Sequence, residues 1–128
     1  MLKIYTHTTQ SSYETAISSL KEKLAEKKFG VLSSIDLPEK FKEKELEFDG
    51  KFTILEICNP FEAFRAVNLN PKVVFFLPCK IVVSKKNDVG IIEMLKPTSM
   101  ISELNDPELD TFALSIETTL IDVIESIR

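Results

Sequence analysis

Residues 52–60 read FTILEICNP, and this stretch joins a strand to the start of a helix. Residues 52–58 are rich in β-branched and aromatic side chains, which suit a half-buried strand. Asn59 and Pro60 are residue types favoured at the N-cap and at the first position of a helix, and Glu62 stands three residues after the cap. The stretch therefore predicts a strand over 52–58 that passes directly into a helix at Asn59.

A second junction, LPCK at residues 77–80, follows another Asn-Pro helix start at residues 70–71. Its proline closes the apolar segment VVFF, and its cysteine opens a strand that extends to residue 84. The turn KKND, residues 85–88, connects this strand to another over 89–95. The two strands together predict a β-hairpin.

The N-terminal part of the chain predicts a strand, a long helix and a second strand. Residues 2–8 alternate loosely and indicate the first strand. SSYE at residues 11–14 has the pattern of a capping box, and apolar residues at helical spacing follow it as far as Leu24. Gly30 is suited to a left-handed cap at the end of this helix. The second strand is expected over 31–37.

The rest of the chain predicts mainly helix. The Lys/Glu-rich residues 38–47 indicate a short exposed helix or an ordered loop, and residues 97–104 indicate a connector. Residues 106–108 read DPE and start a final helix. Its expected buried stripe consists of Leu109, Phe112, Ile116, Leu120, Ile124 and Ile127.

The resulting order of elements is β-α-β-(α)-β-α-β-β-α, in a single domain over residues 1–128. A long helix near each end and a run of strands between them predict an α+β fold. We expect a two-layer sandwich with a five-stranded, mainly antiparallel sheet and the two long helices on one face.

The charge distribution limits the kinds of partner. The net charge is −4, and residues 97–128 hold seven acidic residues and one basic residue, which argues against a nucleic-acid surface over the whole domain. Residues 51–96 hold seven basic and four acidic residues, which suits a small-molecule or anionic ligand. No apolar run approaches the length of a membrane span, so no membrane partner is expected.

The two cysteines are too few for a disulfide scaffold, and the first residues lack the apolar core of a signal peptide. A cytoplasmic protein with free thiols is therefore expected. We also expect no cofactor, because the chain has no Gly-rich phosphate loop and no common catalytic motif.

Cys58 and Cys79 are the main candidate site residues, because both thiols stand beside prolines at strand ends. Cys58 precedes the predicted N-cap Asn59, and a thiol aimed at the unpaired N–H groups of a first helical turn has a lowered pKa. The alternative is that Cys58 is a small hydrophobe in a packed strand end. If the two cysteines are adjacent, they could form a disulfide, hold a persulfide or bind a metal; otherwise they are unrelated core thiols.

Other polar residues extend this candidate site. Strand alternation places Glu56 on the same side as Cys58, where a carboxylate could act as a base or ligand but would oppose thiolate formation. His7 could complete a zinc set, although no spacing supports one. Arg65 and Lys80 could attract an anion to the helix start, or could simply be solvated. The candidate site comprises Glu56, Cys58, Asn59, Pro60 and Cys79.

Four phenylalanines near the two junctions are expected to form core. Core is expected rather than a ligand site, but these residues could equally build a self-association surface, because a sheet with one helix layer leaves its other face to cover. These residues are Phe61, Phe64, Phe75 and Phe76.

The two junctions also carry a resemblance. ILEICNP at residues 54–60, followed by Ala63 and Ala66, resembles the CNP motif of the domain-of-unknown-function 302 family. LPCKIVV at residues 77–83 resembles its LPC motif. The family often has Lys-Leu-Gly before the third strand, and residues 43–48 here lack that glycine, so no role of that loop is carried over.

This resemblance implies a compact α+β domain with a TBP-like sheet-and-two-helices arrangement. It also implies that the domain is often dimeric, and it implies no established activity.

The leading hypothesis is thus a small cytoplasmic binding or interaction domain, acting as a homodimer, with Cys58 and Cys79 lining its site. A second hypothesis is a thiol-dependent enzyme or a sulfur- or redox-handling protein with Cys58 as nucleophile and Cys79 as resolving partner. A third is a metal site.

Overall fold

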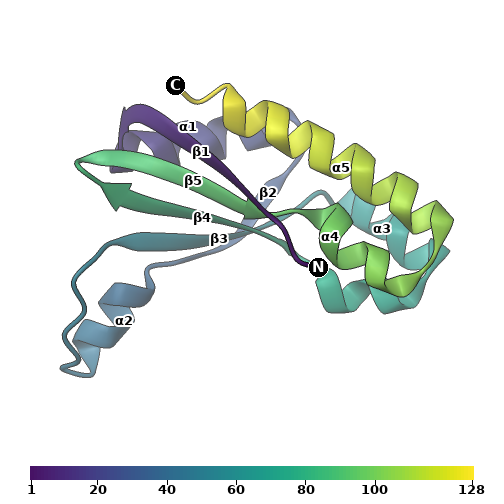
Figure 1. Ribbon diagram of the computed structural model, residues 1–128, viewed down its shortest axis with the longest axis horizontal. Coiled ribbons are helices and arrows are strands. Elements are labelled where there is room, and N and C mark those ends of the chain that lie inside the picture. Colours follow the sequence, from purple (N-terminus) through teal and green to yellow (C-terminus); the bar gives the residue numbers. More distant parts are fainter.

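The computed structural model describes the whole chain, Met1–Arg128, as a five-stranded sheet with its long helices on one face (Figure 1). The strands lie in the order β1-β5-β4-β3-β2, and all four neighbouring pairs are antiparallel. The expected α+β two-layer sandwich is therefore confirmed. The strands are β1 (Ile4–Ser12), β2 (Gly30–Ile35), β3 (Phe52–Cys58), β4 (Cys79–Lys86) and β5 (Val89–Leu95).

The two long helices, α1 (Tyr13–Glu26) and α5 (Pro107–Glu125), lie together on one side of the sheet (Figure 1). The shorter helices gather at its two ends. Figure 1 shows α2 at one end, near the start of β3, and α3 and α4 at the other. These shorter elements are α2 (Leu37–Glu43), α3 (Pro60–Leu69), η1 (Pro71–Phe76), α4 (Pro97–Ile101) and η2 (Ser102–Leu104), where η marks a 3₁₀ helix.

The main core fills the space between the sheet and the two long helices. Alternate residues of the central strands point into it, as the strand patterns predict. The helices contribute residues three and four positions apart. The residues of this core are Tyr13, Ala16, Leu20, Leu24, Phe29, Leu55, Ile57, Ile81, Val83, Ile92, Met94, Ile116, Leu120, Val123, Ile124 and Ile127.

A second, smaller core holds α3, η1 and α4 against the N-terminal half of α5. It fixes α3 at the end of the sheet where β3 ends and β4 begins. Phe112, which is half-buried, packs against both cores and joins them. The fully buried members of this core are Ala66, Val73, Ile101, Leu109 and Ala113.

The start of α1 differs from the prediction. Strand β1 runs to Ser12, beyond the predicted end at residue 8, with an irregularity in its pairing between Thr8 and Ser12. Ser12, not Ser11, is the N-cap of α1, and its hydroxyl accepts a hydrogen bond from the Thr15 amide at 3.1 Å. The helix therefore has a serine cap, shifted by one residue from the predicted box.

The predicted left-handed cap at Gly30 is wrong. The left-handed residue is Lys28, with φ 66°, and Gly30 is the first residue of β2. Helix α1 ends at Glu26, so the position after its C-cap falls on Lys28. The amide of Phe29 then donates to the Leu24 carbonyl at 3.0 Å, which closes the helix end in the usual way without a glycine.

The prediction that the four phenylalanines form core is wrong for three of them. Phe61, Phe64 and Phe75 are exposed, because α3 and η1 turn Ala66 and Val73 toward α5 instead. Only Phe76 reaches the second core. The Lys/Glu-rich stretch 38–47 does form an exposed helix, α2, with no buried residue.

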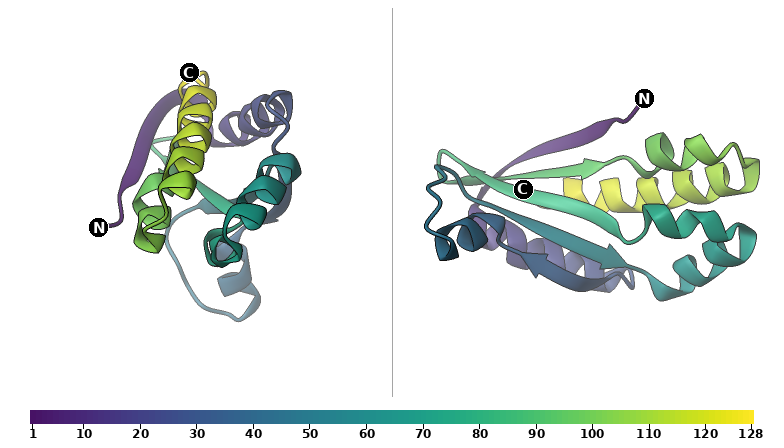
Figure 2. Two further views of the ribbon diagram at one scale, coloured as in Figure 1. Left: turned by 90° about the vertical axis from the view of Figure 1, so that its right-hand side faces the viewer. Right: turned by 90° about the horizontal axis from the view of Figure 1, so that it is seen from below.

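One face of the sheet has no helix layer. Seen from below, this open face is in front and α1 and α5 lie behind it (Figure 2, right). Half-buried apolar side chains alternate with polar ones across it, including Ile54, Val82 and Glu93. Among the helices, none combines the length and the apolar character that crossing a bilayer requires.

Candidate functional site

Cys58 and Cys79 meet at one end of the sheet, where β3 passes into α3 and η1 passes into β4. The β3–β4 ladder pairs Ile57 with Cys79, so Cys58 lies one residue beyond the direct partner of Cys79. Both cysteines line one small cavity of about 20 Å³. The other residues of this thiol pocket are Ile57 of β3 and, from four further segments, Phe29, Asn59, Glu62, Ala63, Leu77, Phe112 and Ile116.

The two thiols differ in exposure and are both held protonated. Cys79 packs against the main core, and burial raises its pKa to about 11, with a smaller contribution from the nearby charge of Cys58. Cys58 is half-buried and nearer to solvent, and burial also raises its pKa. Neither thiol forms a disulfide. Because the thiolate is the nucleophilic form, this environment disfavours rapid thiol chemistry at neutral pH.

The start of α3 explains why the helix does not activate Cys58. Asn59 is the N-cap, and its side-chain oxygen accepts from the amides of Phe61 and Glu62, at 3.1 and 3.3 Å. The amide of Ala63 donates to the Asn59 carbonyl, and Pro60 has no N–H group. Every amide of the first turn is therefore occupied or absent, and none is free to stabilise a Cys58 thiolate.

This cap gives a first testable prediction. Replacing Asn59 with alanine removes two hydrogen bonds to the helix start and should lower the free energy of unfolding by about 1 kcal/mol. Urea unfolding monitored by circular dichroism measures the change. Asn68→Ala is a suitable control, because Asn68 is an exposed residue of the same helix that bonds only to the Phe64 carbonyl. Equal effects of the two changes would contradict the capping role of Asn59.

Glu56, a predicted site residue, does not line the thiol pocket. It lies on the open face, where Ser33 donates to its carboxylate at 2.6 Å, and its neighbour across the ladder is Lys80. The acidic residue that does line the pocket is Glu62, whose carboxylate pairs with Arg65. Sequence reasoning treated Glu62 only as a helix-start residue, although its position three residues after the cap also places it beside Cys58.

His7 lies far from the cysteines. Strands β5 and β4 separate its strand from β3, and strands lie about 4.8 Å apart. The His7 ring bonds instead to the carbonyl of Ile127, near the C-terminus. The chain contains no group of three or more His, Cys, Asp or Glu side chains placed to hold a metal ion. A zinc set formed by His7, Glu56 and the cysteines is therefore incompatible with this geometry.

The two cationic residues proposed to attract an anion are also elsewhere. Arg65 forms an ion pair with Glu62 at 3.2 Å on the surface of α3. Lys80 is exposed on the open face beside Glu56. Neither lines the thiol pocket, whose one ionisable side chain besides the thiols is the acidic Glu62. The mostly apolar lining of the pocket disfavours an anion inside it.

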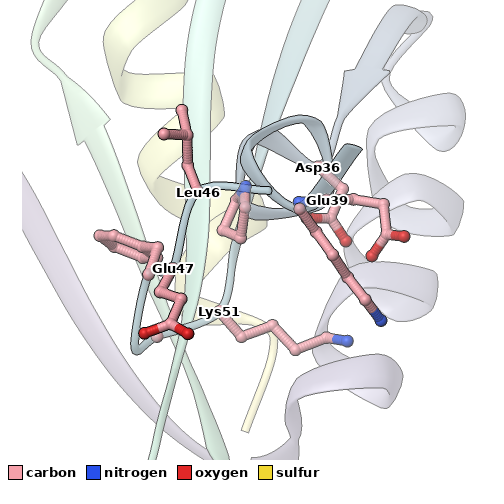
Figure 3. Close-up of a pocket in the computed structure, with 9 residues that line it drawn as sticks. Asp36, Glu39, Leu46, Glu47 and Lys51 are labelled. Atoms are coloured by element: carbon pink, nitrogen blue, oxygen red, sulfur yellow. The ribbon is translucent and has the colours of Figure 1, made fainter. Parts of the chain in front are cut away.

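A larger hollow of about 370 Å³ lies between α2 and the loop that returns to β3. Figure 3 shows that its carboxylates do not converge, since Asp36 and Glu39 lie on the side of α2 and Glu47 lies on the opposite side. Asp36 is already used as the N-cap of α2, where it accepts from the Glu39 amide at 3.0 Å. The hollow is open, and mostly charged and polar surface residues line it, so its size alone does not make it a site.

Comparisons with known proteins place the chain in a family. The family model described as "Domain of unknown function DUF302" matches residues 5–127. A crystal structure of an uncharacterized conserved DUF302 protein from Bacillus stearothermophilus is similar over 98% of this chain and 98% of that chain, with a TM-score of 0.93 and 40% sequence identity. No curated protein matches this chain.

Proposed function

This chain belongs to the DUF302 family, whose description names no activity, and from that premise we propose that it is a small binding domain whose site is the thiol pocket of Cys58 and Cys79. The proposal includes a TBP-like arrangement of the sheet and its two long helices, a cytoplasmic location and a homodimeric state. The two free cysteines support a reducing location.

One observation carries the proposal. Two cysteines that are distant in sequence, at different strand ends, line the same cavity. The cavity lies where two cores meet, and half-buried Cys58 links it to solvent. A site of this kind is positioned by rigid elements on all sides, which suits recognition of a ligand without large rearrangement.

The dimensions and chemistry of the pocket limit its ligand. A cavity of about 20 Å³ has room for roughly one water-sized group, so only the end of a ligand can enter. Most of the lining is apolar, and both thiols are neutral near pH 7 because burial raises their pKa values. We therefore expect a neutral, apolar end group to lie against the two sulfur atoms, with the rest of the ligand outside near Asn59 and Glu62.

Neither alternative function gains a supporting observation. A Cys58 nucleophile requires a lowered pKa, and the pKa is raised. The third hypothesis, a metal site, lacks a sufficient set of ligands within one chain.

Alkylation of the native protein tests the proposal. We expect iodoacetamide near neutral pH to modify Cys58 in the native protein, about tenfold more slowly than in the unfolded chain, and Cys79 only after unfolding. Peptide mass spectrometry assigns each modification, and a Cys58→Ala variant controls for misassignment. Small apolar compounds that slow the modification of Cys58 would be ligands of the pocket.

Two results would argue against this function. If neither cysteine reacts until the protein unfolds, the pocket is closed and the thiols are core residues. If Cys58 reacts faster than a free thiol, the nucleophile hypothesis replaces the binding hypothesis.

A further inference from the structure

The turn that follows α1 meets the start of α3 beside the thiol pocket. Phe29, in this turn, is buried and lines the pocket. Asn59, at the start of α3, also lines the pocket, and its side-chain amide donates to the carbonyl of Lys27 at 3.5 Å. The two residues before Phe29, Lys27 and Lys28, are exposed and therefore lie next to the pocket. We call these two residues the lysine rim.

The position of Lys28 is fixed by both its backbone and its side chain. Its φ of 66° is the left-handed conformation that ends α1, and its amide donates to the Ala25 carbonyl at 3.0 Å. Its ammonium lies 5.7 Å from the centre of the Phe61 ring, which is the range of a cation–π contact. Because Phe61 follows Pro60 in the first turn of α3, this contact holds the ammonium beside the helix start that lines the pocket.

The lysine rim carries positive charge that no acidic group compensates. Glu62 is the one acidic residue that lines the pocket, and Arg65 donates to both oxygens of its carboxylate at 3.2 Å. Glu26, the acidic residue next to the rim in the sequence, pairs with Lys23 at 3.6 Å. Neither lysine of the rim forms an ion pair. A small apolar cavity thus lies beside two unpaired positive charges.

We propose that the thiol pocket binds an amphipathic anion, with the end of a short apolar chain against Cys58 and Cys79 and an acidic head group beside Lys28. The inference rests on the proposed function, because it names the class of ligand for the same pocket. The mostly apolar lining accepts the chain end and excludes a charge, whereas the lysine rim attracts a negative charge outside it. The amides of the first turn of α3 are occupied or absent, so the rim and not the helix start holds the head group.

The short distance between the pocket and the rim limits the length of the chain. Phe29 and Lys28 are adjacent residues, so their Cα atoms lie about 3.8 Å apart. A chain of a few carbon atoms therefore spans from the cavity to the ammonium. Phe61, which is 68% exposed, adds apolar surface beside Lys28. A long fatty-acid chain would leave most of its carbon atoms in water, so a short chain such as that of hexanoate fits best.

Two compounds with the same chain test this inference through the protection of Cys58 from iodoacetamide. Hexanoate is ionised at neutral pH, and hexanol is neutral. At low ionic strength we expect hexanoate to halve the rate of modification at about fivefold lower concentration than hexanol, since a single opposite charge in water has an effect of this size. Added salt should reduce the difference, because it screens exposed charges.

The variant Lys28→Asn tests the origin of this preference. Asparagine tolerates left-handed backbone, so the substitution removes the charge and leaves the turn intact. We expect the variant to lose most of its preference for hexanoate, while hexanol protects Cys58 as in the wild type. Lys86→Gln is the matched control, because Lys86 is an exposed lysine at the opposite end of β4 from Cys79, and it should keep the full preference. Circular dichroism should show both variants folded.

The outcomes separate this inference from the proposed function. Equal protection by hexanoate and hexanol would overturn the anionic ligand and leave a binding pocket for apolar groups standing. A preference that Lys28→Asn retains would also overturn the inference, because the head group would then lie away from Lys28. If neither compound protects a Cys58 that reacts in the native protein, both the inference and the apolar end group of the proposed function fail.

Discussion

Replacing Gly90 with alanine is expected to lower the free energy of unfolding by about 3 kcal/mol. Gly90 lies on β5 directly beneath α1. A Cβ atom added there would stand 2.6 Å from the Cβ of Ala16 and 3.5 Å from the Cα of Tyr13. Two non-bonded carbon atoms do not approach each other to 2.6 Å, so α1 must move away from the sheet. That movement would loosen the core along α1, which buries Leu20 and Leu24.

A second substitution tests the cause of this effect. Ala16→Gly removes the methyl group that the new side chain would meet, so the double variant Gly90→Ala/Ala16→Gly should regain part of the lost stability. Ala16→Gly alone should cost about 1 kcal/mol through helix propensity. The double-mutant cycle in urea then yields a favourable coupling energy of at least about 1 kcal/mol.

Gly30→Ala is the matched control for this cycle. A Cβ atom at Gly30 would meet only the Cys58 carbonyl, at 3.9 Å, which is an ordinary contact. The substitution should change stability by less than about 0.5 kcal/mol. If Gly90→Ala is as mild as Gly30→Ala, α1 does not lie as close to β5 as the structure shows.

Gly90 also illustrates which features could be predicted from the sequence. The strands over 52–58 and 89–95 agree with the structure, and Asn59 and Asp106 cap the helices that they were expected to start. Each of these features depends on residues that are close together in the sequence. The contact between Gly90 and Ala16 joins positions far apart in the chain, and nothing near either residue indicates it.

The thiol pocket was predictable only in part for the same reason. The sequence places Cys58 and Cys79 at strand ends, but their adjacency depends on the β3–β4 register that pairs Ile57 with Cys79. The direction of the thiol pKa shift depends on burial and on the occupied amides of α3. The role of Asn59 as a cap was predicted. The structure adds that its side chain occupies the amides of Phe61 and Glu62, so these amides cannot stabilise a Cys58 thiolate.

Buried polar residues and exposed apolar residues were the hardest to predict. Glu117 is buried, and its carboxylate accepts from the Thr98 amide and hydroxyl, at 3.1 and 2.7 Å. It thereby supports the start of α4, whose N-cap residue Lys96 makes no side-chain bond. Phe61 and Phe64 are the opposite case, large apolar residues that are exposed. Composition assigns phenylalanine to the core, whereas the fold turns Ala66 inward and both rings outward.

The stability of the protein should fall in alkaline solution because Cys79 is buried. The pKa of Cys79 is about 11 in the folded protein, against an ordinary value of 9.0 for a cysteine thiol. Between these values the unfolded chain releases the thiol proton while the folded protein retains it, so the unfolded state binds fewer protons. The free energy of unfolding therefore decreases as the pH rises, and the loss due to Cys79 reaches about 2 kcal/mol at pH 11.

A Cys79→Ala variant isolates this contribution. Near pH 8 the variant should be less stable than the wild type by about 1 kcal/mol, because it loses core contacts of the sulfur. The raised pKa values of Tyr5 and Tyr13 act in both proteins and cancel in the comparison. The charges of Cys58 and Cys79 interact, so the measured difference includes the part of the Cys58 titration that depends on Cys79. As the pH rises through the window set by Cys79, the wild type alone loses that thiol's contribution, so the difference should shrink and then reverse. Urea unfolding at several pH values up to about 11 measures both curves.

If the curves stay parallel, Cys79 ionises as freely in the folded protein as in the unfolded chain. The thiol pocket would then be open to water, and the apolar ligand end group that we propose for it would lose its basis.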